Sequence, residues 1–264
     1  MKVLFFGDIV GKISRRAIKV ILPKLKEEFQ PDLVMANAEN AAHGSGVTKK
    51  ILEELNQAGI EFFTSGNHIF KKPEANELLT AKNSIIIRPA NYQGELPGKG
   101  YKVVEVGSKK LLVINLMGRV FIPEEFDCPF KKVDEILDQV DTNDLAGIIV
   151  DFHAEATSEK VAFGWHVDGR VSAVLGTHTH VPTADFKILP QGTGYITDVG
   201  MVGASESVIG DKKETVLNSF LTDGSHKVEI PEEGEVQVNA VLVEIDPKTK
   251  KTTAINRLDR KIKV

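Results

Sequence analysis

Two histidines of this chain are spaced to bind one metal ion. They lie in the segment Gly-Thr-His-Thr-His at 176–180, directly after an apolar run at 170–175 that is typical of a buried strand. Residues two apart in an extended chain point the same way, and neutral imidazole is a common metal ligand. Two surface histidines on a loop would give the same short pattern, so the prediction that His178 and His180 bind metal depends on the rest of the chain.

Further oxygen and nitrogen donors stand where other predicted strands end. They are Asp8, Glu39 with Asn40, Asn67 with His68, and His153. Taken alone, Asp8 could cap a helix, Asn67 could lie in a turn, and either histidine could be an ordinary core or surface residue. Because five strand ends carry such donors, we expect them to meet at one edge of a sheet and to supply ligands for two divalent cations.

The donor set also predicts the kind of metal. It contains carboxylates, amides and imidazoles but no thiolate, which suits iron, manganese or zinc better than calcium or magnesium. A carboxylate such as Glu39 can bridge two metals about 3.5–4 Å apart, the spacing used to activate hydroxide and hold a phosphoryl group. Two such ions bring about +4 against about −2 from Asp8 and Glu39, so the site should attract phosphate.

The elements expected around these residues alternate between strands and helices. Strands are expected at 2–6, 32–37, 60–64, 84–87, 101–106, 111–116, 146–150, 170–175, 184–189, 194–197, 236–245 and 251–258, and helices at 14–29, 48–58, 76–79, 131–140 and 155–163. Pro23 should kink or split the first helix, and 198–210 should form a Gly-rich loop. Alternation with polar strand ends is typical of a parallel, layered sheet. We therefore predict an α/β fold, a layered β-sheet core flanked by helices, in one domain spanning 1–264.

The composition indicates which partners and which cellular compartment to expect. The net charge of −4 does not suggest stable nucleic-acid binding, although it does not exclude an anionic substrate. The single cysteine, Cys128, excludes an internal disulfide and fits a reducing cytoplasm, and we interpret it as a structural thiol. No stretch approaches the length of a membrane span, and the apolar N-terminus is too short for a signal peptide. Whether the chain forms a homo-oligomer is left open.

The motifs and their order resemble the calcineurin-like binuclear metallophosphoesterases. The similar residues are Gly7-Asp8, Gly-Asn-His at 66–68, His153, and Gly-x-His-x-His at 176–180. That superfamily usually begins with Asp-x-His, where this chain has Asp-Ile-Val at 8–10. Its second motif usually has a bridging aspartate, where this chain has Asn-Ala-Glu-Asn at 37–40. Both departures resemble the YmdB-type phosphodiesterase subgroup, and the similarity continues through 115–119, 151–160, 176–185 and 197–201.

The resemblance implies a calcineurin-like fold and a phosphodiesterase for which 2′,3′-cyclic nucleotides are the characteristic substrates. It implies one metal held by Asp8, Glu39, Asn40 and His180, and a second held by Glu39 as bridge, Asn67, His153 and His178. Iron is the favoured metal, with manganese or zinc as alternatives. A metal-bridging hydroxide would attack phosphorus. His68 would then protonate the leaving oxygen or bind the phosphoryl oxygens.

Several nearby residues have open roles. Arg119 could contact phosphate or form a surface salt bridge, and Glu155, Thr157 and Lys160 could orient His153. His43, His166 and His226 match no ligand position and are interpreted as surface residues, with the role of His43 left open.

Two other functions were weighed. A P-loop at 7–12 is disfavoured because only three residues separate its glycines and Ile13 follows the lysine. A metal-dependent regulatory protein that binds a nucleotide with little turnover and signals through a partner would use the same ligands, so it remains the alternative to an enzyme.

Overall fold

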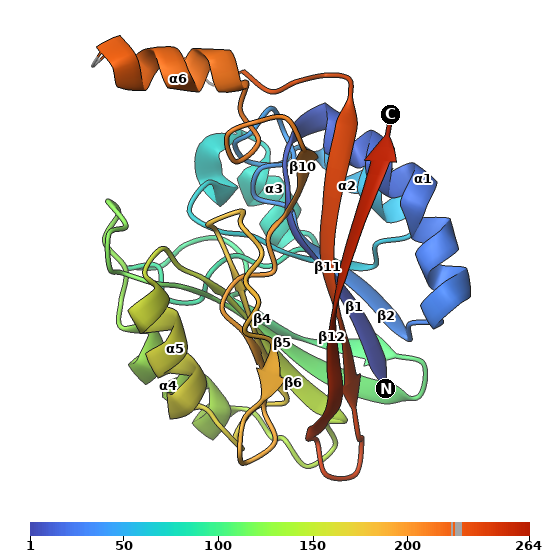
Figure 1. The fold of residues 1–264 in the computed structure, drawn as a ribbon. Coiled ribbons are helices and arrows are strands. Elements are labelled where there is room, and N and C mark those ends of the chain that lie inside the picture. Colours follow the sequence, from blue (N-terminus) through green and yellow to red (C-terminus); the bar gives the residue numbers. More distant parts are fainter. Residues whose placement is uncertain (223, 225–228) are drawn as a thin grey trace.

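Two six-stranded β-sheets form the core of the protein (Figure 1). The computed structural model describes residues 1–222, 224 and 229–264, so His226 lies outside the described residues. The first sheet has the order β12 (Thr252–Lys263), β11 (Glu235–Ile245), β10 (Met201–Ala204), β1 (Lys2–Ile9), β2 (Leu33–Asn37) and β3 (Phe62–Thr64). The second has the order β4 (Tyr101–Val106), β5 (Lys109–Met117), β6 (Gly147–His153), β7 (Ala173–Thr177), β9 (Gly194–Ile196) and β8 (Lys187–Ile188).

The two sheets pack on each other through alternating side chains of their strands. Val3 and Phe5 of β1 are buried in one apolar cluster with Val113 of β5 and Ile149 of β6. The intervening side chains of β1 point to the other face of the first sheet, because successive residues of a strand alternate between faces. There they pack on the helices α1 (Gly11–Phe29) and α2 (Lys49–Gln57).

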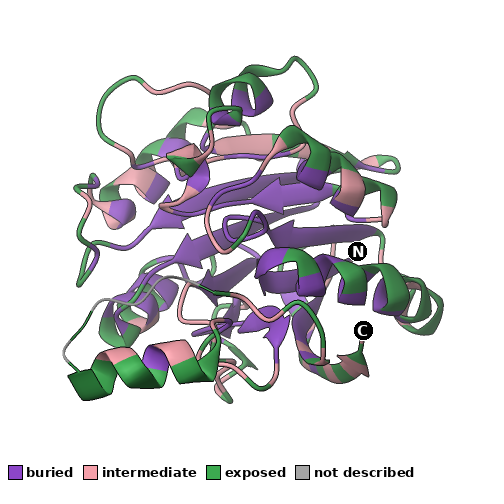
Figure 2. Ribbon diagram, turned by 90° about the horizontal axis from the view of Figure 1, so that it is seen from above, coloured by how far each residue is buried: buried purple, intermediate pink, exposed green. Residues whose placement is uncertain are grey.

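The outer face of the second sheet is covered in the same way. Leu112 and Ile114 of β5 join a cluster with residues of α4 (Pro129–Gln139) and α5 (Thr157–His166). Figure 2 shows the buried strands in the middle, with helices above and below that expose their outer sides. The shorter helices are η1 (Ile69–Lys71), α3 (Ala75–Thr80) and α6 (Lys213–Thr222). The predicted α/β architecture, a layered sheet core flanked by helices, is confirmed.

Three expectations about individual elements were wrong, and one helix was not expected. Pro23 does not split the first helix, because it lies on the exposed side of α1, where the carbonyl that loses its partner can meet water. Residues 84–87 form only a bridge between Ile86 and Phe63. Strand β10 lies inside the expected Gly-rich loop, and α6 was not expected at all. No described helix is long and apolar enough to cross a membrane.

Parallel pairing sets the place of the functional residues. Strands β1, β2 and β3 run parallel in the first sheet, and β5, β6, β7 and β9 run parallel in the second. The carboxyl ends of parallel strands lie at the same edge of a sheet, and ligand groups collect there. Each sheet therefore presents one such edge.

Replacing Phe5, which is fully buried between the sheets, with alanine should lower the free energy of unfolding by about 3–5 kcal/mol, the usual cost of removing a buried aromatic ring. Urea denaturation measures this. Phe220→Ala is the matched control, because that ring is 78 % exposed on α6 and its loss should change the free energy by less than about 0.5 kcal/mol. Equal losses at both positions would contradict the packing described for the two sheets.

Candidate metal centre

The predicted donors come together where the carboxyl edges of the two sheets meet. Asp8 lies in β1, the Glu39 and Asn40 pair follows β2, and the Asn67 and His68 pair follows β3, all in the first sheet. The three remaining histidines belong to the second sheet: His153 ends β6, and His178 and His180 follow β7. The expectation that one sheet would gather these ends was wrong, because the chain crosses to a second sheet after β3.

Three of these residues form a compact group of possible ligand atoms. Glu39, His153 and His178 each offer an atom within 4.8 Å of the others. Nε2 of His153 lies 3.2 Å from Oε2 of Glu39 and 3.0 Å from Nδ1 of His178. Atoms bound to one metal at 2.0–2.2 Å are about 3.0–3.5 Å apart, so these spacings suit a shared cation. A Cβ at Gly66 would collide with Glu39 and His153, which explains the glycine there.

In the predicted assignment, the other metal ion shares Glu39 and is held by Asp8, Asn40 and His180. Nδ2 of Asn40 is 3.1 Å from Nε2 of His180. A half-turn of the Asn40 amide exchanges its nitrogen and oxygen, which would present the oxygen to the same place. Oδ2 of Asp8 accepts a hydrogen bond from the backbone N–H of His178 at 3.0 Å. Its Oδ1 is buried and has no hydrogen-bond partner among the described residues, as expected for an atom that binds a cation.

Asn67 is the predicted ligand with no direct contact to the other donors in the described structure. Its Nδ2 donates to Oε1 of Glu124 at 3.2 Å, and its buried Oδ1 has no partner among the described groups. Because the amide nitrogen of Asn67 donates to Glu124, the amide oxygen is the atom that stays available, and oxygen is the amide atom that a metal prefers. Glu124 was missed at the sequence level, because it lies in a loop far along the chain with no motif to mark it.

His68 lies at the edge of the group with its ring partly exposed. Its Nδ1 is 2.9 Å from Oδ1 of Asn40 and 3.3 Å from Oε1 of Glu39. Its backbone N–H donates to Oε2 of Glu39. One ring nitrogen therefore faces the donors, and none of the described residues bonds the other.

The buried carboxyl groups of the site depend on nearby positive charge to stay ionised. Burial raises the pKa of Asp8, although the charges of His153 and His180 oppose this. Burial also opposes ionisation of Glu39, but the charge of His153 and hydrogen bonds from His153 and His68 hold its pKa well below the ordinary value. Burial alone would lower the pKa of His153, yet the carboxylates of Glu39, Asp8 and Asp151 raise it to about 9. A proton on His153 thus supplies positive charge that a metal ion could supply instead.

A hydrogen-bonded chain sets the orientation of His153. The hydroxyl of Thr177 donates to Asp151 at 2.6 Å, so it accepts from Nδ1 of His153 at 2.9 Å. Nε2 therefore faces Glu39, and in the neutral ring it is the nitrogen whose lone pair can bind a metal. Asp151 also accepts from Asn37 and Thr64, and burial raises its pKa to about 6. A sequence signal existed, since Asp151 is two residues before His153 on the same strand face.

Among the described contacts, the ring of His153 has no hydrogen bond from Glu155, Thr157 or Lys160, the residues expected to orient it. Oε2 of Glu155 lies 3.1 Å from Nε2 of His178, and Thr157 begins α5. The backbone of Arg119 donates to Glu159 and its side chain is exposed. His43 is exposed, and His166 pairs with Asp134.

A buried ion pair holds the turn that carries His178 and His180. Nζ of Lys160 donates to Asp198 at 2.6 Å and to the carbonyl of Thr177 at 2.7 Å. Asp198 also accepts from the backbone N–H and the hydroxyl of Thr179. Both histidines have positive φ, 96° and 65°, which non-glycine residues rarely adopt. The ion pair therefore secures a strained turn between two predicted ligands.

The chain is similar to known proteins over nearly its whole length. A family model described as YmdB-like protein matches residues 4–258. A 2′,3′-cyclic-nucleotide 2′-phosphodiesterase from Bacillus subtilis (strain 168) is 45 % identical over 258 residues, which is 98 % of this chain and 96 % of that protein.

Solved structures extend the comparison to the fold. A novel phosphatase from Mycoplasma pneumoniae has a TM-score of 0.91 and 39 % identity, covering 99 % of this chain and 93 % of that one. The NAD nucleotidase of Haemophilus influenzae has a TM-score of 0.54 at 15 % identity, covering 100 % of this chain and 50 % of that one, a likeness of fold alone. The fold is the calcineurin-like metallophosphoesterase fold that the motifs predicted. The family model matches nearly the whole length of the chain, and the chain therefore belongs to the YmdB-like protein family.

Proposed function

We propose that this protein is a binuclear-metal phosphodiesterase that hydrolyses 2′,3′-cyclic nucleotides. The observation that carries the proposal is the meeting of Glu39, His153 and His178 within 4.8 Å, with the unpartnered Oδ1 of Asp8 beside them. The relative from Bacillus subtilis, named for this activity, supports the choice of substrate.

The residues fit two cations in the arrangement expected from the motifs. Asp8, Glu39, Asn40 and His180 would hold one ion, and Glu39, Asn67, His153 and His178 the other, with iron favoured over manganese or zinc. Bound there, the ions would polarise phosphoryl oxygens and lower the pKa of water. The protein's single cysteine fits work in a reducing cytoplasm.

His68 has the geometry of a group that acts on the substrate. Contacts to Asn40 and Glu39 hold one side of its ring, while its other nitrogen is not bonded by any described residue. That nitrogen can donate a proton to a leaving alkoxide or a hydrogen bond to a phosphoryl oxygen. Excess positive charge at the site would draw the anionic phosphodiester towards it.

Elemental analysis of anaerobically purified protein, followed by turnover assays on 2′,3′-cyclic AMP and bis-p-nitrophenyl phosphate, tests the proposal. We expect about two metal ions per chain, as the two-metal arrangement requires, and turnover that a chelator abolishes and Mn²⁺ or Fe²⁺ restores. Metal without turnover of any phosphoester would contradict it and favour the regulatory protein.

Replacing His68 with alanine should leave both metals bound while kcat falls by roughly 10²-fold or more, the usual contribution of a positioned acid. Metal content and steady-state kinetics measured on one preparation decide the outcome. Loss of metal in this variant would show that His68 is a ligand instead.

Glu39→Gln should weaken metal binding itself, because it removes the charge of the proposed bridge. The matched control is Glu159→Gln, since Glu159 is also buried but accepts from the backbone of Arg119 and Val120 and bonds no proposed ligand. Titration with Mn²⁺ should show a large loss of affinity for the first variant and a small one for the second. Unchanged occupancy in Glu39→Gln would remove the case for a bridge.

Asp198→Asn should lower metal affinity by about 10–100-fold, the usual effect of losing a group that orients a ligand, because the turn at 177–180 loses its anchor. Asp185→Asn is the control: Asp185 accepts from Thr183 and Thr197 but not from that turn. Mn²⁺ titration with a circular-dichroism check on folding compares them. A folded Asp198→Asn protein with unchanged affinity would show that the ion pair does not position the histidines.

A further inference from the structure

A cavity of about 380 Å³ lies directly beside His180. Its lining comes from the loop after β7, from β10 and the loop that follows it, and from β11: His180, Val181, Pro182, Met201, Ser205, Ser207, Val208, Ile209 and Gln237. A predicted metal ligand, His180, forms part of its lining. Its volume falls within the range of small-molecule sites.

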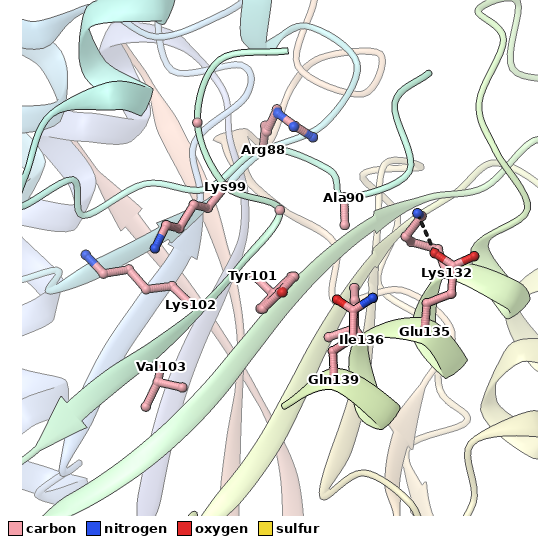
Figure 3. Close-up of a pocket in the computed structure, with 12 residues that line it drawn as sticks. Arg88, Ala90, Lys99, Tyr101, Lys102, Val103, Lys132, Glu135, Ile136 and Gln139 are labelled. Carbon is pink, nitrogen blue, oxygen red and sulfur yellow. Dashed lines mark hydrogen bonds and ion pairs between the residues drawn. The ribbon is translucent and has the colours of Figure 1, made fainter. Parts of the chain in front are cut away.

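A larger cavity lies away from the metal donors. It has a volume of about 610 Å³ and opens between the edge strand β4 and α4, where Figure 3 shows Tyr101, Lys102 and Lys132 around it. None of the predicted donors lines it. A substrate whose phosphate lies at the metal centre would extend into the smaller cavity, because His180 belongs to both.

The walls of the smaller cavity are apolar at its mouth. Val181 is 56 % exposed and Ile209 is 53 % exposed, Val208 is partly buried, and Met201 is buried. Apolar side chains exposed beside a polar centre are typical of a surface that packs on a ligand. A flat heteroaromatic ring matches such walls.

The side-chain amide of Gln237 is a polar group of the cavity that a ligand can reach. Gln237 lies in β11 opposite Gly203 of β10, and the Met201 side chain packs over Gly203, where a Cβ would collide with it. No described residue bonds the Gln237 side-chain amide. An amide both donates and accepts hydrogen bonds, so it can pair with the edge of a nucleobase.

A hydrogen bond connects the wall of the smaller cavity to the predicted metal ligand His180. The carbonyl of Ile209 accepts from Nδ1 of His180 at 2.7 Å, which leaves Nε2 of His180 for the metal. Ile209 has a φ of 47°, a costly conformation for a β-branched residue. Ser207 bonds the carbonyl of Ala204 and the N–H of Gly210, so the loop is held in this shape. Strain of this kind is typical of functional loops.

We propose that this cavity is the nucleobase site of the enzyme, with Gln237 reading the edge of the base and Val181 and Ile209 packing on its faces. The inference rests on the proposed function and deepens it. Phosphate lies at the metal centre, and the base extends past His180 into the cavity.

Kinetics on two substrates test the site. Glycerol 1,2-cyclic phosphate has the same five-membered cyclic diester as 2′,3′-cyclic AMP but no base. Gln237→Leu should raise KM for the nucleotide about 5–10-fold, the value of one or two lost hydrogen bonds, with kcat unchanged. Gln237→Trp, which fills the cavity, should lower kcat/KM for the nucleotide further. Both variants should hydrolyse the glycerol ester as the wild type does, which also shows that they fold.

Gln139→Leu is the matched control, because Gln139 lines the larger cavity and should affect neither substrate. Equal kinetics of wild type and both Gln237 variants on the nucleotide, or a defect in Gln139→Leu instead, would overturn the assignment. Binding of adenosine 3′-monophosphate by calorimetry separates the base site from catalysis. If the wild type hydrolyses neither ester, the proposed function fails. In that case, loss of adenosine 3′-monophosphate binding in Gln237→Trp would still support the base site. Equal binding by the wild type and Gln237→Trp would overturn it.

Discussion

Buried negative charge that needs a cation is the constraint on which the rest of the structure depends. Asp8 and Glu39 are removed from water at the junction of the two sheets, with the fully buried His153 between them. Taking an ionised group out of water costs several kcal/mol unless it is compensated. The imidazole of His153 lies where that compensation is needed, since the carboxylates around it raise its pKa to about 9, and two divalent ions would complete it.

The architecture serves this constraint by stacking two sheets with their carboxyl edges together. Alternating apolar residues of β1 and β5 fix how the sheets face each other, so Asp8 at one edge and His153 at the other cannot drift apart without exposing the core. Around the donors, polar partners are themselves buried and bonded: Asp151 with Thr177, and Lys160 with Asp198. Such satisfied networks hold a site rigid, whereas an unpaired group would weaken the fold.

Local patterns at the sequence level predicted the layered class and picked out residues that the fold brings near one another. The spacing of His178 and His180, and the polar ends of apolar runs, are properties of a few adjacent residues, and the structure places those ends together. What was missed depends on distant parts of the chain. The division into two sheets follows from which strands pair. The contact of Glu124 with Asn67 joins a loop to a strand end 57 residues away. Strand β10 was hidden because Gly200 and Gly203 mimic a loop, although the φ of 90° at Gly200 favours glycine for a structural reason.

Anomalous diffraction at the manganese edge, from crystals grown with Mn²⁺, tests the central claim most directly. The account predicts two peaks, one among Glu39, His153, His178 and Asn67 and one among Asp8, Glu39, Asn40 and His180, about 3.5–4 Å apart as in two-metal phosphoesterase sites. A single peak, peaks that leave Glu39 unbound, or peaks at any other part of the molecule would contradict it.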